Sequence, residues 1–85
     1  MNLAADRDEL LAFLDTIRRP QFPTDAIEDH DSLVESGLID SLAVLQIILF
    51  LEQEFGIDFT AAGFDPDELA SIAGILDLIE RRSKR

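Results

Sequence analysis

Two serine residues in identical tripeptides are the first candidates for chemistry in this sequence. Asp-Ser-Leu occurs at Ser32 and again at Ser41, and the two copies start nine residues apart. A serine hydroxyl can act as a nucleophile, carry a phosphate ester or cap the start of a helix, and each role needs a different setting. The residues that follow each copy therefore decide between these roles.

The patterns after the two serines differ. Only four residues separate Ser32 from Gly37, which predicts a turn. Ser41 instead opens a helical pattern over 41–55, and Asp40 is placed to cap that helix. In the first turn, free backbone N–H groups and the helix dipole favour a phosphate ester by about 0.3–1 kcal/mol. A serine that only caps the helix fits the same place, so both interpretations are open on these grounds.

The elements that must position these serines are helices. No segment alternates between apolar and polar residues as a half-buried strand would. We predict one all-α domain over residues 1–85, with three main helices, one short helix and a long first loop. The helices are expected at about 7–18, 41–55, 66–70 and 72–82.

Start and stop signals set these boundaries. Asp6 and Glu9 have the spacing of a capping box for the first helix, and Pro20 ends it. Asp65, followed by proline, starts the short helix. Ser71 caps the last helix.

The second helix has more apolar residues than one core face needs. Five of them fall within a sector of about 100° and are expected in the core. They are Val44, Ile47, Ile48, Leu51 and Phe55. Leu42, Leu45 and Leu49 lie on an adjacent stripe, and Phe50 points away from the core sector. The stripe either packs under the first loop or forms a surface for a partner.

The acidity of the chain limits its function classes. Eighteen acidic residues and seven lysines or arginines give a formal net charge of −11. No lysine or arginine occurs between Arg19 and Arg81, whereas fourteen acids do. Such a chain repels nucleic-acid phosphates and attracts basic protein surfaces, so nucleic-acid binding is not expected.

Other features exclude further classes. The chain has no cysteine, no signal-peptide pattern and no apolar run near the length of a membrane span, so a soluble cytoplasmic protein is expected. We also expect a monomer. His30 is the only histidine and stands among acids. Asp29 and Asp31 are spaced as in a calcium loop, but Val34 replaces the glycine that such a loop needs. Neither a metal site nor a hydrolase triad is predicted.

Residues 36–59, SGLIDSLAVLQIILFLEQEFGIDF, resemble the motif of acyl and peptidyl carrier proteins. That motif is Gly-x-x-Asp-Ser-Leu at the start of a helix, then apolar residues at helical spacing, then Leu-Glu-x-Glu-Phe-Gly-Ile. The order of a first helix, a long loop, the Asp-Ser-Leu helix, a short helix and a last amphipathic helix extends the resemblance over nearly the whole chain. It implies a small four-helix carrier-protein bundle.

The resemblance also implies a cofactor and its site. In the family, a magnesium-dependent phosphopantetheinyl transferase moves 4′-phosphopantetheine from coenzyme A to the serine that Ser41 matches, and Asp40 and Leu42 match its usual neighbours. The thiol of this arm holds an acyl or aminoacyl group as a thioester. The implied partners are the transferase, a ligase or synthase that loads the cargo, and a downstream acyltransferase. The chain itself is expected to be a carrier and not an enzyme.

The chain departs from the carriers of fatty-acid synthesis at two places. Those carriers usually have acids where this chain has Ala43 and Gln46, which argues against that pathway and for a more apolar partner surface. The expected surface consists of Leu42, Leu45, Gln46, Leu49 and Glu52. The chain is expected to be free-standing. The alternative is an acidic helical adaptor that is never modified, and modification of Ser41 separates the two hypotheses.

Overall fold

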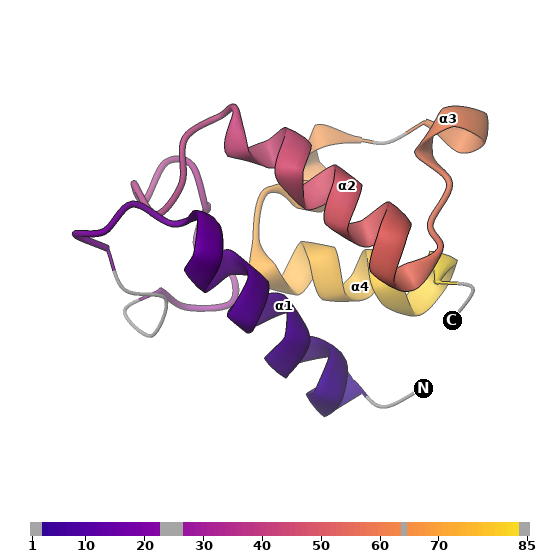
Figure 1. Ribbon diagram of the computed structural model, residues 1–85, viewed down its shortest axis with the longest axis horizontal. Coiled ribbons are helices and arrows are strands. Elements are labelled where there is room, and N and C mark those ends of the chain that lie inside the picture. The colour runs from indigo at the N-terminus through magenta and orange to yellow at the C-terminus, as the bar shows by residue number, and fades with distance from the viewer. Residues whose placement is uncertain (1–2, 23–26, 64, 84–85) are drawn as a thin grey trace.

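The structure is a computed structural model that describes residues 3–22, 27–63 and 65–83. It contains four α-helices and one short 3₁₀-helix, and no strand occurs in these ranges. The elements are α1 (Leu3–Ile17), α2 (Ala43–Phe55), α3 (Phe59–Ala62), η2 (Pro66–Leu69) and α4 (Ile72–Arg82). The long helices α1, α2 and α4 surround a common interior, and α3 stands at the edge of the bundle (Figure 1). The prediction of an all-α bundle is confirmed.

The first helix starts earlier than the sequence indicated. It begins at Leu3 and not near residue 7, so Asp6 lies within the helix and is 4% exposed. The prediction that Asp6 caps the helix is therefore wrong. Two alanines before Asp6 are strong helix formers and extend the helix toward the N-terminus. Near the other end, the N–H of Arg18 donates to the carbonyl of Leu14 at 2.9 Å.

The short segments after α2 differ in detail from the expected helix over 66–70. The turn α3 was not predicted, and the carboxylate of Asp58 starts it by accepting from the N–H and the hydroxyl of Thr60 at 2.9 and 2.7 Å. The element η2 is a 3₁₀-helix, and Asp65 accepts from the N–H of Asp67 at 2.9 Å. At the start of α4, the hydroxyl of Ser71 accepts from the N–H of Gly74 at 3.1 Å.

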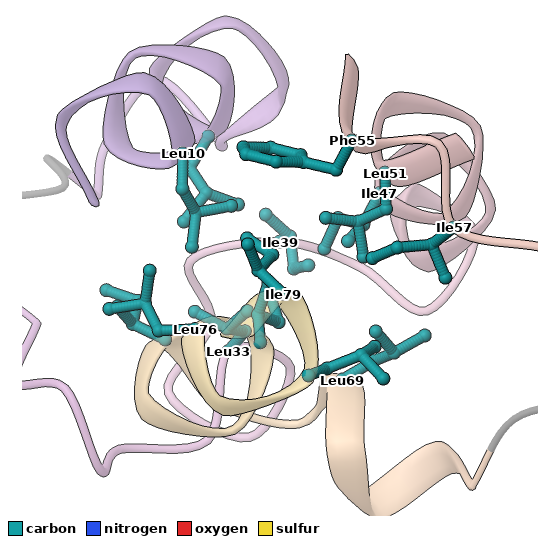
Figure 2. Close-up of a cluster of buried hydrophobic side chains, with 14 of the residues drawn as sticks. Leu10, Leu33, Ile39, Ile47, Leu51, Phe55, Ile57, Leu69, Leu76 and Ile79 are labelled. Atoms are coloured by element: carbon teal, nitrogen blue, oxygen red, sulfur yellow. The ribbon is translucent and has the colours of Figure 1, made fainter. Parts of the chain in front are cut away.

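The core is apolar and draws on every long helix. Figure 2 shows Leu10 of α1, Leu51 of α2 and Ile79 of α4 pointing into one interior together with Leu33 and Ile39 of the first loop. The loop therefore supplies core residues even though it has no helical period. Burying these side chains provides the main stabilisation of so small a domain.

The core face of α2 is shifted from the expected sector. Ile47 and Leu51 are fully buried, whereas Val44 and Ile48 are only partly buried. Phe50, which was expected to point away from the core sector, packs against α1. Its ring stacks on that of Phe13 with centroids 4.2 Å apart and an angle of 8° between the planes. The buried face of α2 therefore includes the side on which Phe50 contacts α1.

Close packing between α4 and η2 predicts that Gly74→Ala lowers stability. A Cβ atom at Gly74 would lie 2.9 Å from the backbone carbonyl oxygen of Glu68, which cannot move without shifting η2. Overpacking of this kind costs about 1–3 kcal/mol, more than the ~1 kcal/mol that alanine contributes over glycine inside a helix. Urea denaturation should show a lower midpoint for the variant. A higher midpoint would show that η2 shifts freely.

Excess negative charge predicts that added salt raises the melting temperature. Fourteen acids between residues 20 and 80 repel each other, and sodium or magnesium chloride screens this repulsion. Ion pairs near the surface, such as that between Arg18 and Asp15 at 2.6 Å, offset the repulsion between the acids only weakly. Thermal melts followed by circular dichroism at several salt concentrations measure the effect. A melting temperature that stays constant or falls would mean that pairing with the arginines outweighs repulsion.

Candidate functional site

Ser41 lies in the turn that leads into α2, and its side chain is exposed. Its hydroxyl makes no hydrogen bond with any residue in the described ranges, and its carbonyl accepts from the N–H of Val44 at 3.4 Å. The N–H groups of Ser41 and Leu42 likewise find no acceptor within the described part of the chain. Two free donors beside an accessible hydroxyl suit a phosphate ester, since an anion there meets the positive end of the helix.

Asp40 forms the cap that the sequence indicated. Its side-chain Oδ1 and its backbone carbonyl both accept from the N–H of Ala43, at 2.9 and 3.1 Å. The regular helix consequently begins at Ala43, two residues after Ser41, and Ser41 lies in the turn that leads into it. The Asp40 carboxylate is thus engaged in holding the backbone around Ser41.

Buried neighbours fix the position of this turn. Ile39 and Ala43, two residues to either side of Ser41, are 0% and 5% exposed. The carbonyl of Leu38 accepts from the N–H of Arg19 at 2.8 Å, which ties the turn to the end of α1. Ser41 is therefore an exposed residue on an anchored backbone, as presentation of a group to other proteins requires.

Gly37 makes the approach to this turn possible. Its φ of 91° lies in the left-handed region that side chains disfavour, and a Cβ atom there would come within 3.2 Å of the Phe22 ring. The sequence indicated the tight turn at this glycine, but the covering ring of Phe22 comes from a distant part of the loop.

Ser32, the serine of the first tripeptide, has a different environment. Its side chain is half-buried, and its hydroxyl oxygen accepts from the N–H of Glu35 at 3.0 Å. Its carbonyl accepts from the N–H of Ser36 at 3.0 Å. The hydroxyl of Ser32 thus stabilises a turn of its own, whereas that of Ser41 is available.

The leucine stripe of α2 is exposed and begins beside Ser41. Leu42, Leu45 and Leu49 are 74%, 61% and 54% exposed. Gln46 is exposed as well, and Glu52 is half-buried. The alternative that the stripe packs under the first loop is therefore excluded. Leucines gathered on one helix face form an apolar surface of the kind that binds partners.

Two further apolar residues at the surface were not expected from the sequence. Phe22 and Val34 of the first loop are 37% and 40% exposed. Neither belongs to a periodic segment, so no pattern in the sequence distinguishes them from the buried loop residues Leu33 and Leu38. Their exposure depends on how the loop folds over the helices.

The acids near His30 serve the fold. The Arg7 guanidinium donates to Asp29 at 2.6 Å, and this hydrogen bond holds the pKa of the Asp29 carboxyl below its usual value. Asp31 accepts from the N–H of Glu28 at 3.0 Å. No group of three potential metal ligands occurs in the described residues. In the same residues, no helix is long and apolar enough to cross a membrane.

Comparisons with known proteins agree with this geometry. The family model described as the phosphopantetheine attachment site matches residues 10–79. A D-alanyl carrier protein from Lacticaseibacillus rhamnosus is 34% identical over 50 residues, which make up 59% of this chain and 62% of that relative. The alignment thus spans less than two thirds of the relative's length. No solved structure matches the chain significantly.

The family match covers both serines, the whole of α2, the second half of α1 and α4 as far as Ile79. The attachment of 4′-phosphopantetheine defines this family, and an exposed serine hydroxyl beside two free N–H groups fits the phosphate end of that cofactor. The chain therefore belongs to the phosphopantetheine attachment site family, as a carrier protein of the acyl and peptidyl carrier type.

Proposed function

We propose that Ser41 bears the 4′-phosphopantetheine arm and that the chain carries an acyl or aminoacyl group on it. The observation that carries this proposal is the free and exposed hydroxyl of Ser41 on an anchored turn, within the segment that the family model matches. The hydroxyl of Ser32 already accepts a hydrogen bond and is the poorer substrate.

The attachment reaction needs only one oxygen atom from this chain. The Ser41 hydroxyl oxygen forms a bond to the phosphorus that bears pantetheine in coenzyme A, and the phosphoanhydride bond to the other phosphorus breaks. The adenosine part leaves with that phosphate, and the hydroxyl proton passes to a base of the magnesium-dependent transferase. Asp40 keeps the turn in place, and the free N–H groups of Ser41 and Leu42 would be available as donors to the new phosphodiester.

The bound arm supplies a thiol that holds the cargo as a thioester. The carrier contributes presentation, while a loading ligase or synthase and a downstream acyltransferase contribute the catalysis. We place the carrier in the cytoplasm, where coenzyme A and the transferase are expected.

The cargo that we propose is an aminoacyl group, with D-alanine as the first candidate. The support is the relative's name, D-alanyl carrier protein, together with 34% identity over the aligned residues. Ala43 and Gln46 agree with this choice, because carriers of fatty-acid synthesis usually have acids at these positions. Ala43 is 5% exposed, so an acid in its place would carry a desolvation cost here.

The partner surface that we propose is the exposed face of α2. It comprises Leu42, Leu45, Gln46, Leu49 and Glu52. The leucines start next to Ser41, so an enzyme seated on them has the arm within reach. A second copy of the chain is not expected to bind this surface, because two molecules that each have a net charge of −11 repel each other.

Intact-mass measurement tests the function in two steps. Incubation with coenzyme A, magnesium and a broad-specificity transferase should add one phosphopantetheine group. The modified protein should then gain a D-alanyl group from a D-alanine-activating ligase and ATP, and should lose it on treatment with hydroxylamine, which cleaves thioesters. If several transferases add nothing, the chain is an unmodified acidic adaptor. If the arm attaches and no amino acid loads, the carrier stands and the aminoacyl cargo is wrong.

A further inference from the structure

The single-turn helix α3 lies between two glycines with left-handed backbone. Gly56 ends α2 with a φ of 67°, and Gly63 follows α3 with a φ of 69°. A Cβ atom at Gly63 would meet nothing within 4 Å, so glycine serves the backbone conformation there and not the packing. Glycine changes its backbone angles at low cost. The segment 57–62 therefore has a backbone joint at each end.

Arg82 at the end of α4 holds both sides of this segment. Its NH2 group donates to the carbonyl of Asp58 at 2.8 Å, and its NH1 group donates to the carbonyl of Gly63 at 3.1 Å. These carbonyls come immediately before and after α3 (Phe59–Ala62). The guanidinium carbon also lies 5.3 Å from the centre of the Phe59 ring. One planar group thus closes the segment through two hydrogen bonds and a cation–π contact.

The end of α2 is fixed by other contacts. The hydroxyl of Ser83 donates to the carbonyl of Phe55 at 3.2 Å, and the N–H of Ile57 donates to the carbonyl of Leu51 at 3.4 Å. Losing Arg82 would leave the Ser83 bond intact, whereas the Ile57 bond belongs to the segment 57–62 and breaks when that segment opens. The buried side chains of Ile57 and Phe59, 2% and 7% exposed, then remain as contacts of the segment 57–62 with the core.

We propose that Arg82 is a strap that keeps α3 closed on the bundle. When its two hydrogen bonds are lost, the segment 57–62 opens about Gly56 and Gly63 as a local unit, while α1, α2 and α4 stay folded. Opening takes the side chains of Ile57 and Phe59 out of the core and exposes them to solvent. In Figure 1, α3 stands at the edge of the molecule. This device is independent of the proposed modification of Ser41.

Amide hydrogen exchange measured by NMR on the unmodified full chain tests the strap. The reporter is the N–H of Gly63, which donates to the carbonyl of Phe59 at 2.8 Å and is protected only while the turn is closed. Arg82→Ala should speed its exchange by about tenfold or more. The N–H of Arg18, at the end of α1, should change much less. In Arg82→Lys, the Gly63 amide should exchange at a rate between those of the wild type and Arg82→Ala. An ammonium group on a flexible side chain lacks the planar arrangement of donors that spans two acceptors.

Arg81→Ala is the matched control. It removes the same charge from the neighbouring position, but Arg81 pairs with Asp77 and Glu68 and not with α3. The Gly63 amide should keep its slow exchange in this variant. An unchanged exchange rate of the Gly63 amide in Arg82→Ala would show that the other contacts of the segment, such as burial of Ile57 and Phe59, hold α3 without Arg82, which overturns the proposal. Equal acceleration of the Gly63 and Arg18 amides would also overturn it, because Arg82 would then support the whole fold.

Discussion

Ser41→Ala is expected to abolish attachment of phosphopantetheine, whereas Ser32→Ala is expected to leave it intact. The Ser41 hydroxyl is the proposed phosphate acceptor, and no other hydroxyl lies beside the free N–H groups at the start of α2 in the described structure. The Ser41 side chain makes no hydrogen bond within the described ranges, so its removal should leave the melting temperature nearly unchanged. Intact-mass measurement after treatment with the transferase reads out the modification.

Ser32→Ala controls for the repeated tripeptide. It should lower stability by about 0.5–2 kcal/mol, because it removes an oxygen that accepts from a backbone N–H at the start of a turn. Modification should nevertheless proceed at the wild-type rate. If Ser41→Ala still gains the adduct and Ser32→Ala does not, the assignment of the two serines is reversed.

Leu49→Asp is expected to weaken loading or modification severalfold to about a hundredfold while the fold is retained. A leucine at the centre of an interface contributes on the order of 1–2 kcal/mol or more, and a buried carboxylate adds a desolvation cost. Leu49 is 54% exposed on the leucine stripe, so the change should not disturb the core. The rate of loading or modification at limiting carrier concentration measures the effect, and circular dichroism checks that the fold is retained.

Gln53→Asp separates the loss of leucine from the gain of charge. Gln53 is exposed one turn beyond Leu49, so this variant adds the same charge to the helix and removes no apolar contact. It should load nearly as well as the wild type, and Gln46→Glu should likewise have a smaller effect than Leu49→Asp. If Gln53→Asp and Leu49→Asp reduce the rate of loading or modification equally, the partners respond to the added charge and not to the loss of leucine. Unfolding of Leu49→Asp would place the stripe in the core.

Local sequence signals predicted much of this fold and the setting of the candidate site. The caps at Asp40, Asp65 and Ser71 form as expected, since each depends on a side chain and backbone groups a few residues away. Helical spacing also separated the buried residues Ile47 and Leu51 from the exposed stripe of α2. The family resemblance rested on the same local pattern around the second tripeptide, and the family match agrees with it.

These local signals did not predict contacts between residues that are far apart in the chain. Phe50 packs on Phe13 of α1, and the helix pattern of α2 carries no information about where α1 lies. The position of α3 depends on Arg82, whose carbonyl partners are 24 and 19 residues away. The difference has a physical basis: caps and periodicity arise from neighbours within a turn or two, whereas burial and long-range hydrogen bonds form only when the whole chain folds.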